Sequence, residues 1–223
     1  MQIYGTPGAY GKSVARKLAI TLSWESLVLF LVTFLGLNLL IAEKKDILII
    51  LGIISSIAIG SYLGYRVKKD YESFVRFIAG VKAEAEVSKE IRKLKPELLA
   101  NGLVIDKIGD CDHLVMDGYI ALVETKRGYG YVELIDGALY INKKRMPRNP
   151  IAQIEKQAKM LSREFGVELE KIICITGAKN TFRHGSIVIT GLEGLNQVIS
   201  NSKHRITPQK AEQIKKIVAN SYK

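Results

Sequence analysis

The sequence predicts a mixed α/β sheet domain that is preceded by a two-helix transmembrane hairpin. Two uncharged apolar runs, residues 26–42 and 47–65, come first, and each is long enough to cross a hydrocarbon core about 30 Å thick. After them, short runs rich in β-branched residues alternate with patterns of helical period, which is typical of a sheet flanked by helices. A third observation concerns polar residues, because an acid, a turn and a Glu-x-Lys triplet follow one another between Asp112 and Lys126. These polar residues belong to the sheet domain and lie outside both apolar runs.

The two apolar runs are best explained as membrane spans. Only four residues, Glu43-Lys44-Lys45-Asp46, separate them, so two spans would have to form an antiparallel hairpin. A pair of buried helices in a soluble domain is the alternative, but such helices normally carry a polar stripe that neither run has. A cleaved signal peptide fits less well, because a second apolar run follows the first at once.

Positive charge predicts the orientation of this hairpin. Basic residues flank the outer ends of both spans, while the connection between the spans carries equal numbers of acids and bases. The flanking residues are Lys12, Arg16, Lys17, Arg66, Lys68, Lys69 and Arg76. By the positive-inside rule, both termini and the sheet domain should face the cytoplasm from a cell membrane that is crossed twice.

These features divide the chain into segments. The expected segments are a short basic arm at 1–23, two transmembrane helices within 24–65, a stalk helix or linker at 66–79, and the sheet domain at 80–223. Within the arm, residues 5–13 end in Gly-Lys-Ser like a phosphate-binding loop. Thr6 occupies the place of that motif's first glycine and no apolar strand precedes it. We therefore expect a flexible arm and no nucleotide site there.

Charge and cysteine content restrict the class of partner. A net charge of +11 predicts a polyanionic binding partner. Nucleic acid and anionic lipid are both such partners, and charge alone does not separate them. Cys111 and Cys174 form no Cys-x-x-Cys pair, and the three histidines show no zinc-ligand spacing. The sequence is thus consistent with a reducing compartment and predicts neither a disulfide nor a structural zinc site.

The elements of the sheet domain follow from local patterns. Its first helix is expected after Gly80, which should interrupt the stalk, and it should end or kink near Pro96. Strands are expected at 102–108, 112–116, 119–126, 131–134, 138–142, 172–176 and 187–190. Further helices are expected to begin at Asn149-Pro150, at Leu192 and at Thr207-Pro208. Asp117-Gly118 and Asp136-Gly137 are typical of hairpin turns.

The predicted hairpin around Asp117-Gly118 carries the residues with the clearest chemistry. Alternation along a strand places Glu124 and Lys126 on one face, and the hairpin would bring Asp112 beside them. Carboxylate oxygens are the ligands of Mg²⁺ or Mn²⁺, and a nearby ammonium can orient a water or stabilise charge on phosphate. This combination indicates metal-dependent cleavage of phosphodiester bonds. An exposed cross-strand ion pair would produce the same Glu-x-Lys pattern without any function.

Four short motifs in this order resemble the nuclease-related domain family. They are Gly80-x-x-x-Glu84, Asp112-His113, Glu124-x-Lys126-x-Gly128 and Asn149-Pro150-x-x-Gln153. The resemblance covers roughly residues 78–222, and the family is similar to a branch of the PD-(D/E)xK nucleases. It implies a restriction-endonuclease-like mixed sheet flanked by helices. It also implies that Asp112, Glu124 and Glu84 bind the metal, and that Lys126 and Gln153 complete the catalytic site.

The apolar runs, the acidic residues and the resemblance together predict a membrane-tethered nuclease that depends on Mg²⁺ or Mn²⁺, with DNA as the expected substrate. Five basic residues could contact phosphate, although a solvated loop would explain them equally well. These residues are Arg127, Lys143, Lys144, Arg145 and Arg148. Gln153 could instead only cap or bridge backbone, and His113 is expected to pack or hydrogen-bond behind the site. Asp110 is expected in an exposed loop, and it would reach the metal only if the strand register slipped by two residues.

Two readings without catalysis remain open at this level. The chain could be a membrane-anchored module that binds nucleic acid or protein and has kept a nuclease-like fold. A lipid-signalling adaptor is a further alternative, which rests only on basic charge beside the membrane.

Overall fold

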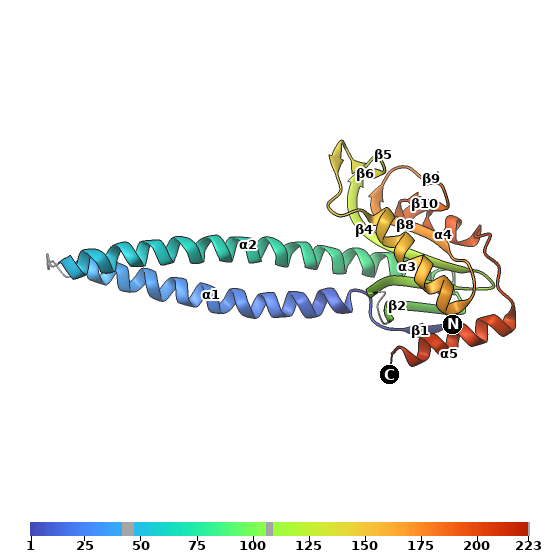
Figure 1. Cartoon of the computed structure of the whole chain (residues 1–223), viewed down its shortest axis with the longest axis horizontal. Helices are drawn as coiled ribbons and strands as arrows, with labels where there is room; N and C mark the ends of the chain where they lie inside the picture. The colour runs from blue at the N-terminus through green and yellow to red at the C-terminus, as the bar shows by residue number, and fades with distance from the viewer. Residues whose placement is uncertain (42–46, 106–108, 223) are drawn as a thin grey trace. The chain divides into compact units, whose positions relative to one another are not determined.

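A computed structural model describes residues 1–41, 47–105 and 109–222 (Figure 1). The chain divides into two compact units, of which one comprises Met1–Tyr10 and Ala79–Lys223 and the other Gly11–Ile78. The predicted connection at 43–46 and the end of the strand predicted at 102–108 lie outside the described residues.

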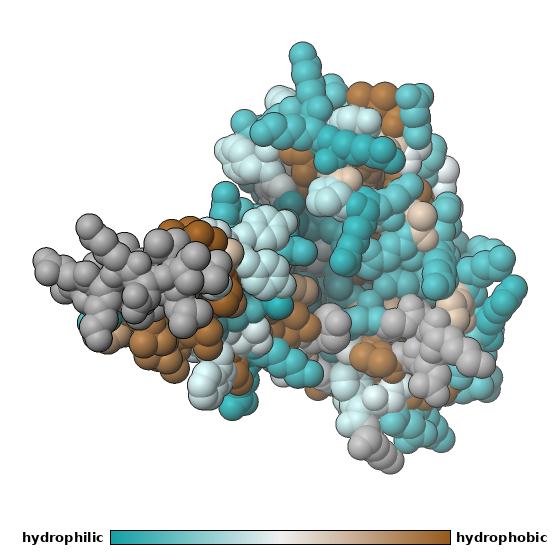
Figure 2. All heavy atoms as spheres, turned by 60° about the vertical axis from the view of Figure 1, so that its left-hand side comes forward, coloured by the Kyte–Doolittle hydropathy of each residue, from teal (hydrophilic) through white to brown (hydrophobic). Residues whose placement is uncertain are grey.

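The unit Gly11–Ile78 consists of most of helix α1 (Ala9–Ile41) and the first part of helix α2 (Ile47–Arg92). Apolar side chains cover its surface (Figure 2), including Leu27, Phe30, Leu31, Phe34, Leu35, Ile54 and Ile57. In the described part of the chain, one helical segment is long and apolar enough to cross a membrane, Gly11–Leu35. This segment overlaps the predicted first span at 26–42 but begins earlier. The side chains at 47–53, where the predicted second span begins, lie outside the description.

Helix α2 differs from the prediction, because it continues without interruption through Gly80 to Arg92. A single glycine costs a helix only about 1 kcal/mol relative to alanine, and its neighbours Ala79 and Val81–Ala83 are compatible with a helix. The predicted stalk and the predicted first helix of the domain are therefore one element. The helix also stops before Pro96, and Leu98 begins a strand.

The sheet unit contains a seven-stranded mixed sheet in the order β1-β2-β3-β4-β8-β10-β9 (Figure 1). Its strands are β1 (Gln2–Tyr4), β2 (Leu98–Ile105), β3 (Gly109–Met116), β4 (Ile120–Gly130), β8 (Glu170–Ala178), β9 (Phe182–His184) and β10 (Ile187–Thr190). The neighbours β2, β3 and β4 run antiparallel, whereas β4, β8 and β10 run parallel. The predicted mixed α/β sheet is confirmed, and β9 was not predicted.

Strand β1 corrects the expectation of a flexible N-terminal arm. Residues 2–4 pair in parallel with 98–100 of β2 and form an edge of the sheet. Tyr4 stacks on Tyr222 at a ring-centroid distance of 5.7 Å, and the Tyr222 hydroxyl donates to the carbonyl of Asn101 at 2.7 Å. The first residues of the chain therefore belong to the sheet domain.

A second, smaller sheet follows β4 and consists of β5 (Val132–Ile135), β6 (Ala138–Ile141) and β7 (Lys144–Arg145). Three helices complete the unit, namely α3 (Pro150–Phe165), α4 (Leu192–Ser200) and α5 (Pro208–Asn220). The predicted helix starts are confirmed. The Asn149 side chain accepts hydrogen bonds from the amides of Ile151 and Ala152, and Thr207 caps α5 in the same way.

Each face of the large sheet is covered by two helices. Apolar residues of α3 and α5 pack on one face with Leu114, Leu122 and other residues of the sheet. The last turns of α2 and helix α4 pack on the opposite face with Val115 and Val123. Because side chains alternate along a strand, the position that follows Val123 points to the α3 face. That position is Glu124.

Candidate active site

The candidate site lies where strands β3 and β4 stop pairing. Their antiparallel register runs from Met116↔Ile120 to His113↔Val123, so the next residues along each strand are Asp112 and Glu124. Beyond this point the backbone amide of Thr125 donates to the Asp112 carboxylate at 2.6 Å. The predicted hairpin is thus confirmed. The Asp112 side chain replaces a backbone carbonyl as the partner of β4, which fixes this carboxylate beside Glu124.

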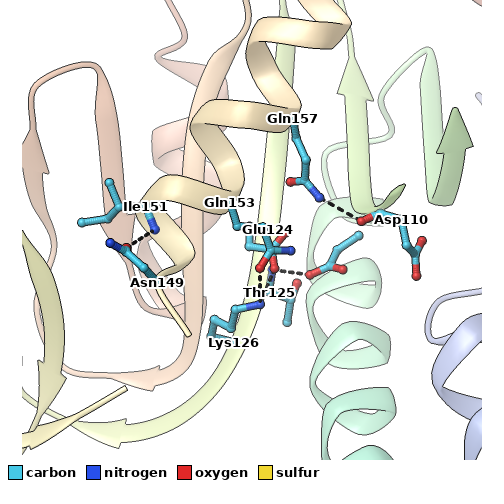
Figure 3. Close-up of polar contacts among 9 residues, drawn as sticks. Asp110, Glu124, Thr125, Lys126, Asn149, Ile151, Gln153 and Gln157 are labelled. Carbon is cyan, nitrogen blue, oxygen red and sulfur yellow. Dashed lines mark hydrogen bonds and ion pairs between the residues drawn. The ribbon is translucent and has the colours of Figure 1, made fainter. Parts of the chain in front are cut away.

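Glu124, Lys126 and Gln153 point toward one another (Figure 3). The Lys126 ammonium donates to Glu124 Oε1 and lies 3.4 Å from Gln153 Oε1. Glu124 is only 1% exposed, and its Oε2 is buried without a hydrogen-bond partner in the described structure. Gln153 lies in the first turn of α3, where the Asn149 cap positions it. Its side chain therefore contacts the site, in contrast to the alternative that it only bridges backbone.

Glu84 approaches the same region from α2. Its Oε2 accepts a hydrogen bond of 2.7 Å from the backbone amide of Gly8, in the segment that connects β1 to α1. Gly8 has a φ of +70°, and a side chain there would meet Val81 at 2.9 Å. Only glycine fits this conformation and this close approach. The N-terminal segment, which was expected to be an arm, thus orients one of the predicted metal ligands.

The carboxylates repel one another. Burial, and then the charges of Asp110 and Glu124, raise the pKa of Glu84 to about 7, although the Gly8 amide and Lys126 oppose this shift. Burial raises the pKa of Asp112 well above its usual range, and the charges of Glu124 and Glu84 add to the effect. Burial also raises the pKa of Glu124, against the influence of Lys126. A cation at this site would relieve the repulsion, so the charge distribution suits a metal ion.

The donor set also suits a metal ion of the magnesium type. Across the described residues, no group of three or more His, Cys, Asp and Glu side chains is arranged to hold an ion. Mg²⁺, however, is usually bound by one or two carboxylates together with waters and phosphate oxygens. Asp112 and Glu124 supply two such carboxylates, and Glu124 Oε2 is without a partner among the described atoms. The two carboxylates are therefore of the chemical type that binds Mg²⁺ or Mn²⁺.

Comparison with known families decides the identity of the sheet unit. Residues 79–190, which make up half of the chain, match the family model of the nuclease-related domain. The chain belongs to the nuclease-related domain family. No curated protein and no solved structure matches it. The matched range contains Glu84, Asp112, Glu124, Lys126 and Gln153, and the placement of this family among the PD-(D/E)xK nucleases is consistent with the match.

Two further polar residues, Asp110 and Gln157, lie near the site, and only Asp110 was considered as a possible metal ligand from the sequence. Asp110 lies in β3 and not in an exposed loop, and burial raises its pKa. Its backbone carbonyl accepts a hydrogen bond of 2.9 Å from the side chain of Gln157, which is buried on α3 (Figure 3). Gln157 follows Gln153 by one helical turn and interrupts the apolar face made by Ile154 and Ala158. That interruption is the sequence signal that could have indicated its role.

His113 faces away from the carboxylates, as expected. It is fully buried, its Nδ1 lies 2.8 Å from Asn101 Oδ1, and burial lowers its pKa to about 3. The imidazole is therefore neutral at physiological pH and supports the fold of β2 and β3.

The five basic residues proposed to contact phosphate are all exposed. Arg127 directly follows Lys126 on β4, and Lys144 and Arg145 form β7. Lys143 occupies the turn before β7, and Arg148 precedes the Asn149 cap. These positions are accessible to a polyanion, and their role in binding stays a prediction.

The raised pKa of Glu84 predicts how stability depends on pH. In the absence of metal, the folded state holds this proton up to about pH 7, whereas an unfolded Glu releases it near 4.5. The folded state binds more protons in this range, so Glu84 lowers stability as the pH rises from about 4.5 to 7. We expect Glu84→Gln to raise the melting temperature of the metal-free protein at pH 8 by about 4 °C, and to change it little at pH 4.5.

The measurement is thermal unfolding of the detergent-solubilised full chain in excess chelator at both pH values. Glu86→Gln is the matched control, because Glu86 lies on the same helix but is exposed. Equal melting temperatures for wild type and Glu84→Gln at both pH values would contradict the assigned environment of Glu84.

Proposed function

We propose that this chain is a membrane-tethered, divalent-metal-dependent nuclease that hydrolyses phosphodiester bonds, with DNA as its main substrate. Membership of the nuclease-related domain family supports the class of reaction. The observation that carries the proposal is the state of the Glu124 carboxylate. One oxygen binds Lys126, and the other is buried without a partner in the described structure, next to the position of Asp112.

In this proposal Asp112 and Glu124 hold Mg²⁺ or Mn²⁺, and Glu84 assists them. The bound ion would polarise the phosphoryl oxygen and lower the pKa of a water molecule. Lys126 is positioned to orient the attacking water or to stabilise the negative charge that develops on the phosphate. Gln153 limits the movement of the Lys126 ammonium through its contact at 3.4 Å. The Thr125 amide holds the Asp112 carboxylate in place.

The tether is proposed from the helical unit alone. Arg66 on α2 forms an ion pair of 3.1 Å with Glu25 on α1, so the end of the second predicted span lies beside the start of the first. Three exposed aromatic residues lie near this pair in sequence, Trp24, Tyr62 and Tyr65. Aromatic residues of this kind gather at membrane–water interfaces. Together with the exposed apolar residues beyond them, they support two spans whose outer ends lie at the cytoplasmic surface.

The proposal is tested with the full chain, because truncation before α2 would remove β1 and the Gly8 amide that binds Glu84. The protein is reconstituted in nanodiscs of zwitterionic lipid and incubated with Mg²⁺, Mn²⁺ or chelator on single-stranded DNA, duplex DNA and RNA. We expect cleavage of DNA that requires the ion. Salt-sensitive DNA binding without turnover under any of these conditions would instead identify a non-catalytic binding module, and equal cleavage in chelator would contradict the metal site.

A further inference from the structure

Strand β4 continues beyond the site to Gly130, and two exposed tyrosines lie at this end, Tyr129 in the strand and Tyr131 directly after it. Tyr129 is 74% exposed and Tyr131 is 62% exposed, which is unusual for aromatic residues next to a sheet core. Tyr129 follows Lys126 by only three residues, so the two are at most about 10 Å apart along the strand. An exposed aromatic surface therefore begins close to the candidate catalytic lysine.

A bulge in β4 turns Tyr129 to the face of the sheet that carries the site. Lys126 pairs with Ile175 and Tyr129 pairs with Gly177, so three steps on β4 match two steps on β8. The extra residue reverses the alternation, and Tyr129 takes the side that Glu124 and Lys126 occupy. The ring of Tyr129 lies over Gly177, where an added side chain would meet it at 2.8 Å.

A single side chain, Asn142, fixes the backbone of both tyrosines. Its amide group donates to the carbonyl of Tyr129 at 3.0 Å, and its side-chain oxygen accepts from the amide of Tyr131 at 3.3 Å. The backbone amide of Asn142 also donates to the carbonyl of Tyr131 at 3.1 Å. Gly130, with a φ of +127°, leaves the space that the Asn142 side chain fills. The backbone that carries the two rings is thus fixed by three hydrogen bonds to Asn142.

One cation lies over the Tyr129 ring, and another directly follows Asn142 in the chain. Lys179 lies over the Tyr129 ring at 5.4 Å from its centroid, and its backbone amide donates to the carbonyl of Gly130. Lys143 directly follows Asn142 in the turn that leads to the exposed Lys144 and Arg145. We call Tyr129, Tyr131, Lys143 and Lys179 the tyrosine patch. Flat aromatic surfaces interleaved with ammonium groups are the combination that binds single-stranded nucleic acid, through base stacking and phosphate contacts.

We infer that the tyrosine patch binds unpaired nucleotides of a single-stranded nucleic acid and leads that strand to the site at Lys126. The inference rests on the proposed nuclease function and adds the substrate class to it. In a duplex the faces of the bases are covered by their neighbours, so exposed rings can stack only on unpaired or terminal bases. Phosphates of the bound strand would contact Lys143 and Lys179.

The test measures binding without cleavage. Full-length protein in nanodiscs of zwitterionic lipid is titrated, in chelator and at fixed salt, into a fluorescent oligo-dT or a fluorescent hairpin duplex of equal length. We expect wild type to prefer the single strand. The double substitution Tyr129→Ala with Tyr131→Ala should weaken single-strand binding about 10-fold or more and duplex binding less than about 2-fold. Tyr129→Phe with Tyr131→Phe should preserve binding, because the rings and not the hydroxyls are used.

Tyr71→Ala is the matched control, since Tyr71 is 60% exposed but lies on α2 outside the sheet unit. Unchanged single-strand affinity in the double Ala variant, or an equal loss on both probes, would overturn the inference. If the double Ala variant lost binding to anionic vesicles but kept its affinity for oligo-dT, the patch would be assigned to lipid, and the inference would be wrong. Wild type that binds the single strand normally but shows no metal-dependent cleavage would refute the nuclease proposal alone. Wild type that cleaves DNA, together with a double Ala variant whose single-strand affinity is unchanged, would refute the role of the patch alone.

Discussion

Substitution Glu124→Gln is expected to reduce metal-dependent DNA cleavage by the full chain about 1000-fold or more, the scale seen when a central catalytic group is removed. Gln keeps the size of the side chain but removes the charge that both Lys126 and a divalent ion require. The side chain is buried and accepts a hydrogen bond from Lys126. No other carboxylate in the described residues is both buried and bonded to Lys126. Folding should persist, because burial already favours the neutral form of this residue and raises its pKa.

The experiment compares initial cleavage rates at saturating Mn²⁺ with oligonucleotide affinity measured in chelator. Affinity should change little, which separates chemistry from binding. Glu133→Gln on β5 is the matched control, since Glu133 is an exposed acid close in sequence, and its rate should stay within about 2-fold of wild type. A Glu124→Gln variant that still cuts at a rate near that of wild type would refute the assigned site.

Introducing two lysines into α1, Val28→Lys with Leu31→Lys, is expected to weaken insertion of the first predicted span, so that a larger fraction of the protein is extracted from membranes. Both residues lie within the apolar segment Gly11–Leu35 and within the predicted first span, and both are exposed on the helical unit. A lysine at the centre of a span costs about 2.5–3.5 kcal/mol for insertion. Residues 28 and 31 lie before the centre of the predicted span 26–42, so each costs less than this value, and the second predicted span is unchanged. The measurement is the fraction of protein that resists extraction of membranes with alkaline carbonate.

Val28→Ala with Leu31→Ala is the control, because it removes apolar area without adding charge. It should remain in the membrane pellet with the wild type. Equal resistance of the lysine variant to extraction would mean that this face of α1 does not contact lipid, and the tether proposed here would then be wrong.

Local patterns predicted the parts of the site that depend on local structure. Asp112, Glu124 and Lys126 lie within one hairpin, whose turn and strand alternation can be read from residues 112–126. Gln153 was expected at the site from the resemblance to the nuclease-related domain family, and the Asn149 cap fixes its place in the first turn of α3. In each case a short stretch of sequence determines the geometry.

The remaining features depend on contacts between distant parts of the chain. Strand β1 has only three residues, too few for a visible period, and its partner lies about a hundred residues later in β2. The same holds for the Gly8 amide, which binds Glu84 76 residues later in the chain. Asn142 is only 13 and 11 residues from Tyr129 and Tyr131, but its contacts depend on how β6 folds back beside the end of β4. The continuity of α2 through Gly80 was missed for another reason, since the favourable neighbours of one glycine outweigh its cost.

The most direct test of the account is the position of Mn²⁺ in crystals of the full chain, measured from anomalous diffraction. The account predicts an anomalous peak about 2.1 Å from one carboxylate oxygen of Asp112 and one of Glu124, on the α3 face of the sheet and next to Lys126. The peak should disappear in Glu124→Gln crystals grown under the same conditions. A peak at other residues only, or none at saturating Mn²⁺, would contradict a metal-dependent site built on Asp112 and Glu124.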